Sequence, residues 1–188
     1  FQPVSSLRFG LAYHSGMTLN LKGDVAFEFP TAFNSAPLNT NPVVLSVKGK
    51  FADQAASAEM ELPANTSLGV TYDVNSAWSM QLELSHTSWS AFQELRVKFG
   101  NGVLPDSVTN ESWKNTWFYA LGTTLKTNSA WTLRAGIALD KSPVTIENRT
   151  PRIPDNDRFW GSVGAGYAIS KNLQRDFAYS HLWVRDAQ

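Results

Sequence analysis

Hydrophobic and polar residues alternate without interruption from Ala130 to Asp140. The side chains on one face are Trp131, Leu133, Ala135, Ile137 and Leu139, and those on the other are Thr132, Arg134, Gly136, Ala138 and Asp140. Because side chains of a strand point alternately to opposite faces, this segment is predicted to be a ribbon with one apolar and one polar face. Such a ribbon suits a transmembrane barrel, which is apolar towards lipid and polar towards its lumen.

The same alternation predicts eight strands and therefore an all-β, antiparallel fold. The strands are expected at about 5–15, 17–29, 62–74, 78–99, 113–127, 130–142, 158–170 and 172–185. In the fourth of these strands the apolar residues change from even to odd numbers, and one extra residue near 85–88 would restore the faces. We therefore expect a β-bulge there.

The connections between these strands alternate in length. Tight turns are expected at Ser15-Gly16, 75–77, 127–129 and Lys171. Long loops rich in Pro, Asn, Ser and Asp are expected at about 30–61, 100–112 and 143–157. Short turns at one end and long loops at the other are typical of an outer-membrane barrel, so we expect the long loops to point outward.

A short repeat supports this interpretation. The sequence Asn-Ser-Ala-Trp ends at Trp78 and again at Trp131, in both cases at the start of an expected strand. Trp at one level of successive strands is typical of an aromatic girdle at the membrane interface. The alternative is that two common turns are each followed by a Trp by chance.

Composition narrows the class of protein. The 188 residues carry 16 basic and 16 acidic side chains, so no basic surface indicates a nucleic-acid partner. The absence of cysteine excludes a disulfide framework or a thiolate metal site. No run of about 18 apolar residues exists, which excludes a transmembrane helix but not a barrel, where only every second residue faces lipid. Since the chain starts at Phe1 without a leader, we expect that a leader was removed or that the chain is an internal piece.

No enzyme constellation is present in the sequence. The three histidines fall on different expected strands, and no hydrolase, metalloprotease or phosphate-loop motif occurs. We therefore expect no enzyme activity, no cofactor and no metal. Asp155 and Asp157 share one loop and could hold a cation, although Asx turns capped by their own backbone are the simpler alternative.

Several segments carry a family resemblance. They are LRFGLAYHS at 7–15, ELP at 61–63, TSWS at 87–90, WTLRAG at 131–136, DKSPV at 140–144 and, most specifically, NRTPRIPDNDRFW at 148–160. With these segments the chain resembles the FadL family of outer-membrane transporters for long-chain fatty acids and hydrophobic compounds. The resemblance implies a bacterial outer-membrane protein that is a monomer at full length, with lipid or detergent around it.

The resemblance also implies a larger fold than this chain supplies. The family barrel has fourteen strands and an N-terminal hatch domain, and the eight strands expected here would be roughly the sixth to the thirteenth. We therefore expect residues 1–188 to be one partial-barrel segment, without the hatch and the last strand. Eight strands could close into a narrow barrel, but a severed half leaves two unpaired edges, which lipid does not tolerate.

The polar face provides candidate ligand contacts. A fatty acid needs an apolar groove for its tail and a cation for its carboxylate. Family members bind the carboxylate with basic lumen residues, and the resemblance makes Lys114 and Arg158 the best positional matches. Phe118 and Trp160 point to the same face and could line the tail channel. Further cations of this face are Arg134 and Arg8.

An alternative for these cations is a network of ordinary lumen ion pairs. Arg134 would then pair with Asp140 or a neighbour, and Arg158 with Asp176. For Lys114 and Arg158 both interpretations stay open.

We predict passive transport of long-chain fatty acids or similar hydrophobic small molecules, by binding and then diffusion. The loop at 30–61, apolar and poor in charge, could be the first docking site or could fold onto the barrel rim. Two alternatives are a soluble lipocalin-like lipid-binding barrel and a porin-type or adhesin-like barrel without a specific ligand.

Overall fold

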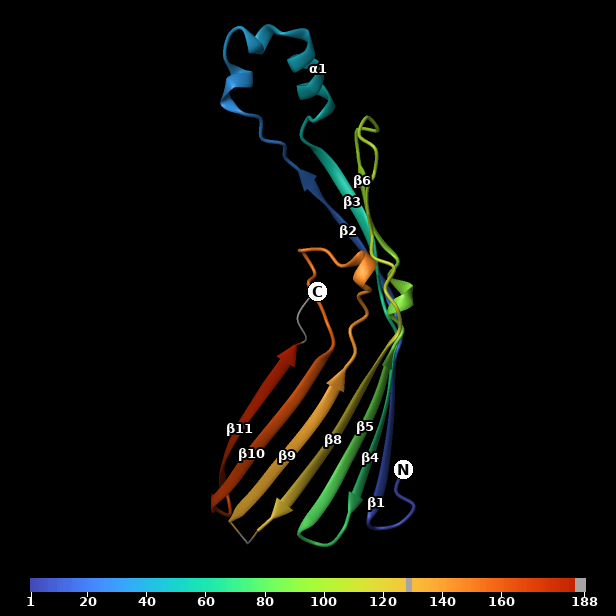
Figure 1. Ribbon diagram of the computed structural model, residues 1–188, viewed down its shortest axis with the longest axis vertical. Coiled ribbons are helices and arrows are strands. Elements are labelled where there is room, and N and C mark those ends of the chain that lie inside the picture. The colour runs from blue at the N-terminus through green and yellow to red at the C-terminus, as the bar shows by residue number, and fades with distance from the viewer. Residues whose placement is uncertain (128–129, 185–188) are drawn as a thin grey trace. The chain divides into compact units, whose positions relative to one another are not determined.

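The computed structural model describes residues 1–127 and 130–184 (Figure 1). The chain forms two compact units. One unit comprises Phe1–Met17, Pro63–Ala91 and the chain from Ser112 onward, and the other comprises Thr18–Leu62 and Phe92–Glu111. Among the described residues, no helix is both long and apolar enough to cross a bilayer.

The first unit is a seven-stranded antiparallel sheet with the order β1-β4-β5-β8-β9-β10-β11 (Figure 1). Its strands are β1 Leu7–His14, β4 Asn65–Asp73, β5 Trp78–Thr87, β8 Thr116–Lys126, β9 Trp131–Asp140, β10 Arg158–Ser170 and β11 Leu173–Val184. The antiparallel pairing expected from the sequence is therefore confirmed.

The second unit combines a four-stranded sheet with short helices. Its strands, in the order β2-β3-β6-β7, are β2 Met17–Val25, β3 Gln54–Leu62, β6 Glu94–Phe99 and β7 Ser107–Asn110. Helix α1 (Pro42–Lys50) follows the 3₁₀ turns Thr31–Asn34 and Leu38–Thr40. It begins after Asn41, whose side chain accepts a hydrogen bond from the Val43 amide at 2.9 Å.

The strand registers keep the two kinds of side chain on separate faces of the seven-stranded sheet. Leu121 of β8 lies opposite Ile137 of β9, and Gly122 lies opposite Gly136. Ile137 is 51% exposed and Phe177 of β11 is 70% exposed, although both belong to the apolar face. A continuous exposed apolar face of this kind fits contact with lipid and not with water.

Aromatic side chains lie near both ends of this apolar face. Trp131 contacts Tyr167 at the end with the tight turns, with ring centroids 4.7 Å apart, and Phe159 contacts Trp183 near the other end at 5.5 Å. Along β10, the eight residue-to-residue steps from Phe159 to Tyr167 span about 26 Å at 3.3 Å per step. This length is close to the apolar band of about 25 Å in outer-membrane barrels, and strand tilt shortens it to about 20 Å.

The first two expected strands do not form a hairpin. β1 pairs with β4, with Leu11 opposite Leu68, whereas β2 belongs to the other sheet. Ser15-Gly16 therefore connects two sheets and is not a hairpin turn, which corrects the prediction. A two-residue Ser-Gly link can form a hairpin turn or connect strands of two different sheets, and only the pairing partners of the flanking strands show which of these occurs.

The strand expected at 78–99 is two strands in different sheets. β5 ends at Thr87, a 3₁₀ turn follows at Trp89–Ala91, and β6 pairs with β3 and β7. The Ser88 amide donates to the Ala64 carbonyl at 2.9 Å, and the Ser90 amide donates to the Asn115 side chain at 2.9 Å. The change of hydrophobic phase therefore marks a break in the strand, and the expected β-bulge at 85–88 is wrong.

Secondary structure also occurs inside two of the expected loops. Residues 30–61 contain α1 and most of β3, and residues 100–112 contain β7. β3 was missed because its residues Gln54–Leu62 are mostly Ala, Glu, Gln and Met, which have low strand propensity, and pairing with β6 overrides that preference. Residues 143–157 form a loop with one 3₁₀ turn, Ile146–Asn148, and a bridge between Thr150 and Ile153.

Part of the expected pattern falls outside the described residues. The turn expected at 127–129 and the second copy of the short repeat include residues 128–129. The last residue of the strand expected at 172–185 and the final residues 186–188 are also outside.

We expect Ile137→Lys to reduce the folded fraction of the intact protein in bilayers strongly. A Lys on the lipid face costs about 2–4 kcal/mol near the bilayer midplane. Ala138→Lys, on the polar face of the same strand, is the matched control and should have a much smaller effect. The folded fraction is measured by heat-modifiable gel mobility after refolding into vesicles. Equal losses in the two variants would contradict this assignment of faces.

Candidate ligand-binding site

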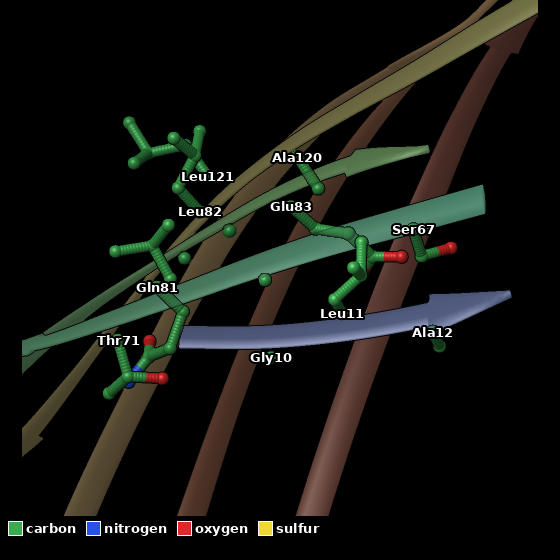
Figure 2. A pocket seen from close by; sticks show the side chains of 14 residues that line it. Gly10, Leu11, Ala12, Ser67, Thr71, Gln81, Leu82, Glu83, Ala120 and Leu121 are labelled. Atoms are coloured by element: carbon green, nitrogen blue, oxygen red, sulfur yellow. The ribbon is translucent and has the colours of Figure 1, made fainter. Parts of the chain in front are cut away.

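The polar face of the seven-stranded sheet is open in its middle. A pocket of about 570 Å³ lies there, because small side chains from neighbouring strands line it. Its small residues are Gly10, Ala12, Ser67, Gly69, Ala120, Gly122 and Gly136. Figure 2 shows this pocket with the side chains of Leu82 and Leu121 on one side of the strands and those of Thr71 and Gln81 on the other.

Charged side chains gather at the end of this face where β9 ends and β10 begins. Arg158, the first residue of β10, lies opposite Asp140, the last residue of β9. Its Nε is 3.4 Å from an Asp140 carboxylate oxygen, and its Nη2 is 3.3 Å from the Asp155 carboxylate. The Arg158 guanidinium, 32% exposed, is thus shared between two carboxylates of this chain.

A second set of contacts holds the loop 143–157 against the end of β9. Ser142 is buried, and its amide and hydroxyl donate to Asp157 and Asp155 at 3.0 and 2.8 Å. The Lys141 ammonium lies 2.6 Å from the Asp157 carboxylate. The two loop carboxylates therefore contact Lys141, Arg158 and Ser142, and the Asn156 side chain accepts the Asp157 amide.

Lys114 lies just before β8 and faces a different pocket. Its backbone amide donates to the Pro143 carbonyl at 3.1 Å, which ties this segment to the loop 143–157. Its exposed side chain helps to line a pocket of about 810 Å³, together with Arg149, Asn156 and Glu147. Within the part of the chain that the structure describes, no ion pair joins the Lys114 ammonium to a carboxylate.

Phe118 and Trp160 lie on the same face as Arg158. Phe118 is opposite Asp140, and Trp160 is opposite Ala138 on one side and Leu182 on the other. Both side chains are half-buried. The Trp160 indole Nε1 is buried without a hydrogen-bond partner among residues 1–127 and 130–184.

Arg134 and Arg8 form ion pairs elsewhere on the polar face. The Arg134 guanidinium reaches from β9 across β10 to the Asp176 carboxylate of β11, at 3.0 Å. Gly166 of β10 leaves the room for this pair, because a Cβ at that position would lie 2.6 Å from Asp176 Oδ1. Arg8 binds Asp73 at 3.1 Å.

The ion-pair alternative is therefore observed with exchanged partners. The sequence predicts Arg134 with Asp140 or a neighbour and Arg158 with Asp176, whereas Arg134 pairs with Asp176, and Arg158 pairs with Asp140 and Asp155. The antiparallel register explains the exchange. Asp140 and Arg134 are six residues apart on one strand, about 20 Å, which no side chain spans.

Arg149 is the residue of this region that sequence reasoning missed. It lines the same pocket as Lys114, although it lies in the loop and not on an alternating strand. Alternation assigns faces only to strand residues, so this pattern cannot select a loop cation. The motif 148–160 contained Arg149 but gave no indication of where its side chain lies.

Comparison with known proteins places this arrangement in a class, a β-sheet segment of an outer-membrane channel. The crystal structure of a Pseudomonas aeruginosa FadL homologue matches 98% of this chain and 42% of its own, with a TM-score of 0.84 and 29% identity. The Pseudomonas putida toluene transporter TodX matches 96% of this chain and 40% of its own, with a TM-score of 0.59. At 17% identity the latter likeness shows the fold alone.

Sequence relatives agree with this class. The long-chain fatty acid transport proteins of Salmonella typhi and Escherichia coli K12 are 36% and 34% identical over 177 residues, 93% of this chain. The model of the family "Outer membrane protein transport protein (OMPP1/FadL/TodX)" matches residues 1–188. The chain belongs to this family of non-enzymatic outer-membrane transport proteins of Gram-negative bacteria. It spans about two fifths of the length of these relatives.

We expect Arg158→Met to lower the unfolding midpoint of the intact protein in detergent more than Arg134→Met does. Loss of Arg158 leaves both Asp140 and Asp155 without this cation in a half-buried site, at a cost of about 1–2 kcal/mol. The Arg134–Asp176 pair is more exposed and contributes about 0–1 kcal/mol. Thermal unfolding followed by circular dichroism measures both, and a larger effect at Arg134 would contradict the prediction.

Proposed function

We propose that this chain is the later part of the wall of a fourteen-stranded transmembrane β-barrel. The support is the exposed apolar face and the two outer strands of the sheet. Among the strands of the described residues, β1 pairs only with β4 and β11 pairs only with β10. On the outer edge of β1, Phe1 and Phe9 exchange backbone hydrogen bonds and Val4 bridges to Leu7. Because lipid does not tolerate open strand edges, further strands of the barrel pair with β1 and β11.

The barrel carries long-chain fatty acids across the outer membrane by passive diffusion. The observation that carries this assignment is the Lys114 ammonium, which lines a pocket beyond the start of β8 without an ion pair to a described residue. Phe118 and Trp160 lie on the polar face of the sheet, outside that pocket. An unpaired cation suits the carboxylate head of an amphiphile, and aromatic side chains on the adjoining polar face suit its tail. The relatives above 30% identity that are named for a substrate are named as long-chain fatty acid transport proteins.

The six expected contact residues have unequal parts in this proposal. Lys114 binds the carboxylate first, since its charge is available. Arg158 contributes charge but is shared with two aspartates, so it contacts ligand only if one of them moves. Phe118 and Trp160 line the path of the tail. Arg134 and Arg8, bound to aspartates, keep the lumen polar and contact ligand least.

Ligand entry uses the second unit. In helix α1, Val43 is 71% exposed, and Leu45 is also exposed. An apolar surface of this kind on the segment 30–61 gives a hydrophobic molecule a first docking site before it reaches the lumen. Transport then needs no enzyme activity, cofactor or metal, only binding and diffusion.

A second candidate substrate is a neutral hydrocarbon, since two structural relatives are the monoaromatic hydrocarbon channel CymD and the toluene transporter TodX. The pocket lined by Gly10, Gly69 and Gly136 favours it, because that surface has few charges. The lipocalin-like alternative is not favoured, since the sheet exposes its apolar face. A porin-type barrel without a specific ligand is the outcome if no saturable binding occurs.

We expect Lys114→Met to weaken oleate binding by the intact protein in detergent by about 10-fold or more. The physical reason is the loss of one charge-assisted hydrogen bond, worth about 1.5–3 kcal/mol. Lys171→Met, in the tight turn after β10, is the matched control and should bind oleate like the unaltered protein. Isothermal titration calorimetry measures the affinity. Unchanged affinity after Lys114→Ala combined with Arg158→Ala would remove the proposal.

A further inference from the structure

We propose that Arg149 is the second cation of the carboxylate site and determines the preference of the channel for acids over neutral lipids. This inference rests on the proposed function, the transport of fatty acids. It assigns the head of the ligand to the pocket between the start of β8, the loop 143–157 and the end of β11. The tail then leaves this pocket towards the polar face of the sheet.

Lys114 and Arg149 line this pocket together although 35 positions separate them in the sequence. Its volume of about 810 Å³ is within the range of small-molecule sites. Apolar side chains of Val144, Ile146 and Val184 share the lining. Two cations with apolar neighbours match a carboxylate followed by the first methylenes of an acyl chain.

The backbone on both sides of Arg149 is fixed by local hydrogen bonds. The 3₁₀ turn Ile146–Asn148 precedes it, and the Arg149 amide donates to the Ile146 carbonyl at 3.4 Å. The Asn148 side chain donates to Thr145 Oγ1 at 2.9 Å. After Arg149, the Ile153 amide donates to the Thr150 carbonyl at 3.1 Å. Arg149 is thus held between two tight turns, which is the support a recognition residue needs.

The Arg149 guanidinium has hydrogen-bonding capacity to spare. Its Nε is buried and has no hydrogen-bond partner among the described residues, and no ion pair joins Arg149 to a carboxylate there. A buried N–H without an acceptor is unfavourable, so the guanidinium gains hydrogen-bond energy by turning this N–H towards an incoming acceptor. A carboxylate fits best, because the planar guanidinium offers parallel N–H groups to its two oxygens.

The other charges of this region favour Arg149 over Arg158 as the partner of Lys114. Arg158 already binds Asp140 and Asp155, and it does not line this pocket. Asp157 lines the pocket but is held by Lys141 and Ser142. Glu147 also lines it and is exposed, so its charge competes with a ligand carboxylate.

The test compares oleate with oleyl alcohol, which has the same chain and no charge. Binding to the intact protein in detergent is measured by isothermal titration calorimetry for the unaltered protein and for Arg149→Gln. The matched control is Arg152→Gln, an exposed arginine of the same loop that does not line the pocket. Heat-modifiable gel mobility confirms that each variant is folded.

We expect Arg149→Gln to weaken oleate binding about 10-fold and to change oleyl alcohol binding less than about 2-fold. Arg152→Gln should change neither. Arg149→Lys should restore part of the oleate affinity, because an ammonium keeps the charge but not the fork. Glu147→Gln should strengthen oleate binding a few-fold, since it removes a like charge from the pocket.

The outcomes separate this inference from the proposed function. If the unaltered protein does not bind oleate saturably, or if Lys114→Met has no effect, the proposed function fails. If Lys114→Met weakens oleate binding and Arg149→Gln does not, only the assignment of Arg149 is overturned. An equal loss of oleate and oleyl alcohol in Arg149→Gln also overturns it, because the role would then be to hold the loop.

Discussion

The pairing of the seven strands in one register is the constraint on which the other features depend. Each strand presents alternate residues to opposite faces, and hydrogen bonds between neighbours keep these faces in step from β1 to β11. A shift of one residue in any strand would turn its leucines to the polar face and its charges to the apolar face. The ladder thus determines both where the molecule meets the membrane and where it offers polar groups.

The polar face differs in character between the middle and the ends of its strands. Its middle is lined by small residues such as Gly122 and Gly136, which leave space. The ion pairs stand at the ends of strands or bridge three of them, as at Arg158 and at Arg134. The pocket of Lys114 and Arg149 lies beyond the end of the sheet, where a loop and not the ladder sets the geometry. Space and charge are therefore provided by different segments.

Sequence periodicity predicted the regular part of the structure and not the exceptions. The faces of β8 to β11 follow directly from alternation, as do the positions of Arg158, Phe118 and Trp160 on one face. Alternation did not predict the break after Thr87 or the strand Gln54–Leu62, because both depend on partners distant in the sequence. The ion-pair partners and the pocket of Arg149 were not predicted for the same reason. Alternation shows on which face a side chain lies, but it does not show which residue of another segment lies beside it.

The ion pair between Arg134 and Asp176 passes over Gly166 and connects β9 to β11, which are not neighbours in the sheet. Arg134, Gly166 and Asp176 belong to three different strands, and the ion pair forms only when all three residues are present. During divergence, a larger residue at position 166 would displace the Asp176 carboxylate and break its ion pair with Arg134. These three positions should therefore be inherited as a unit, either all kept or all exchanged, although they are far apart in the gene.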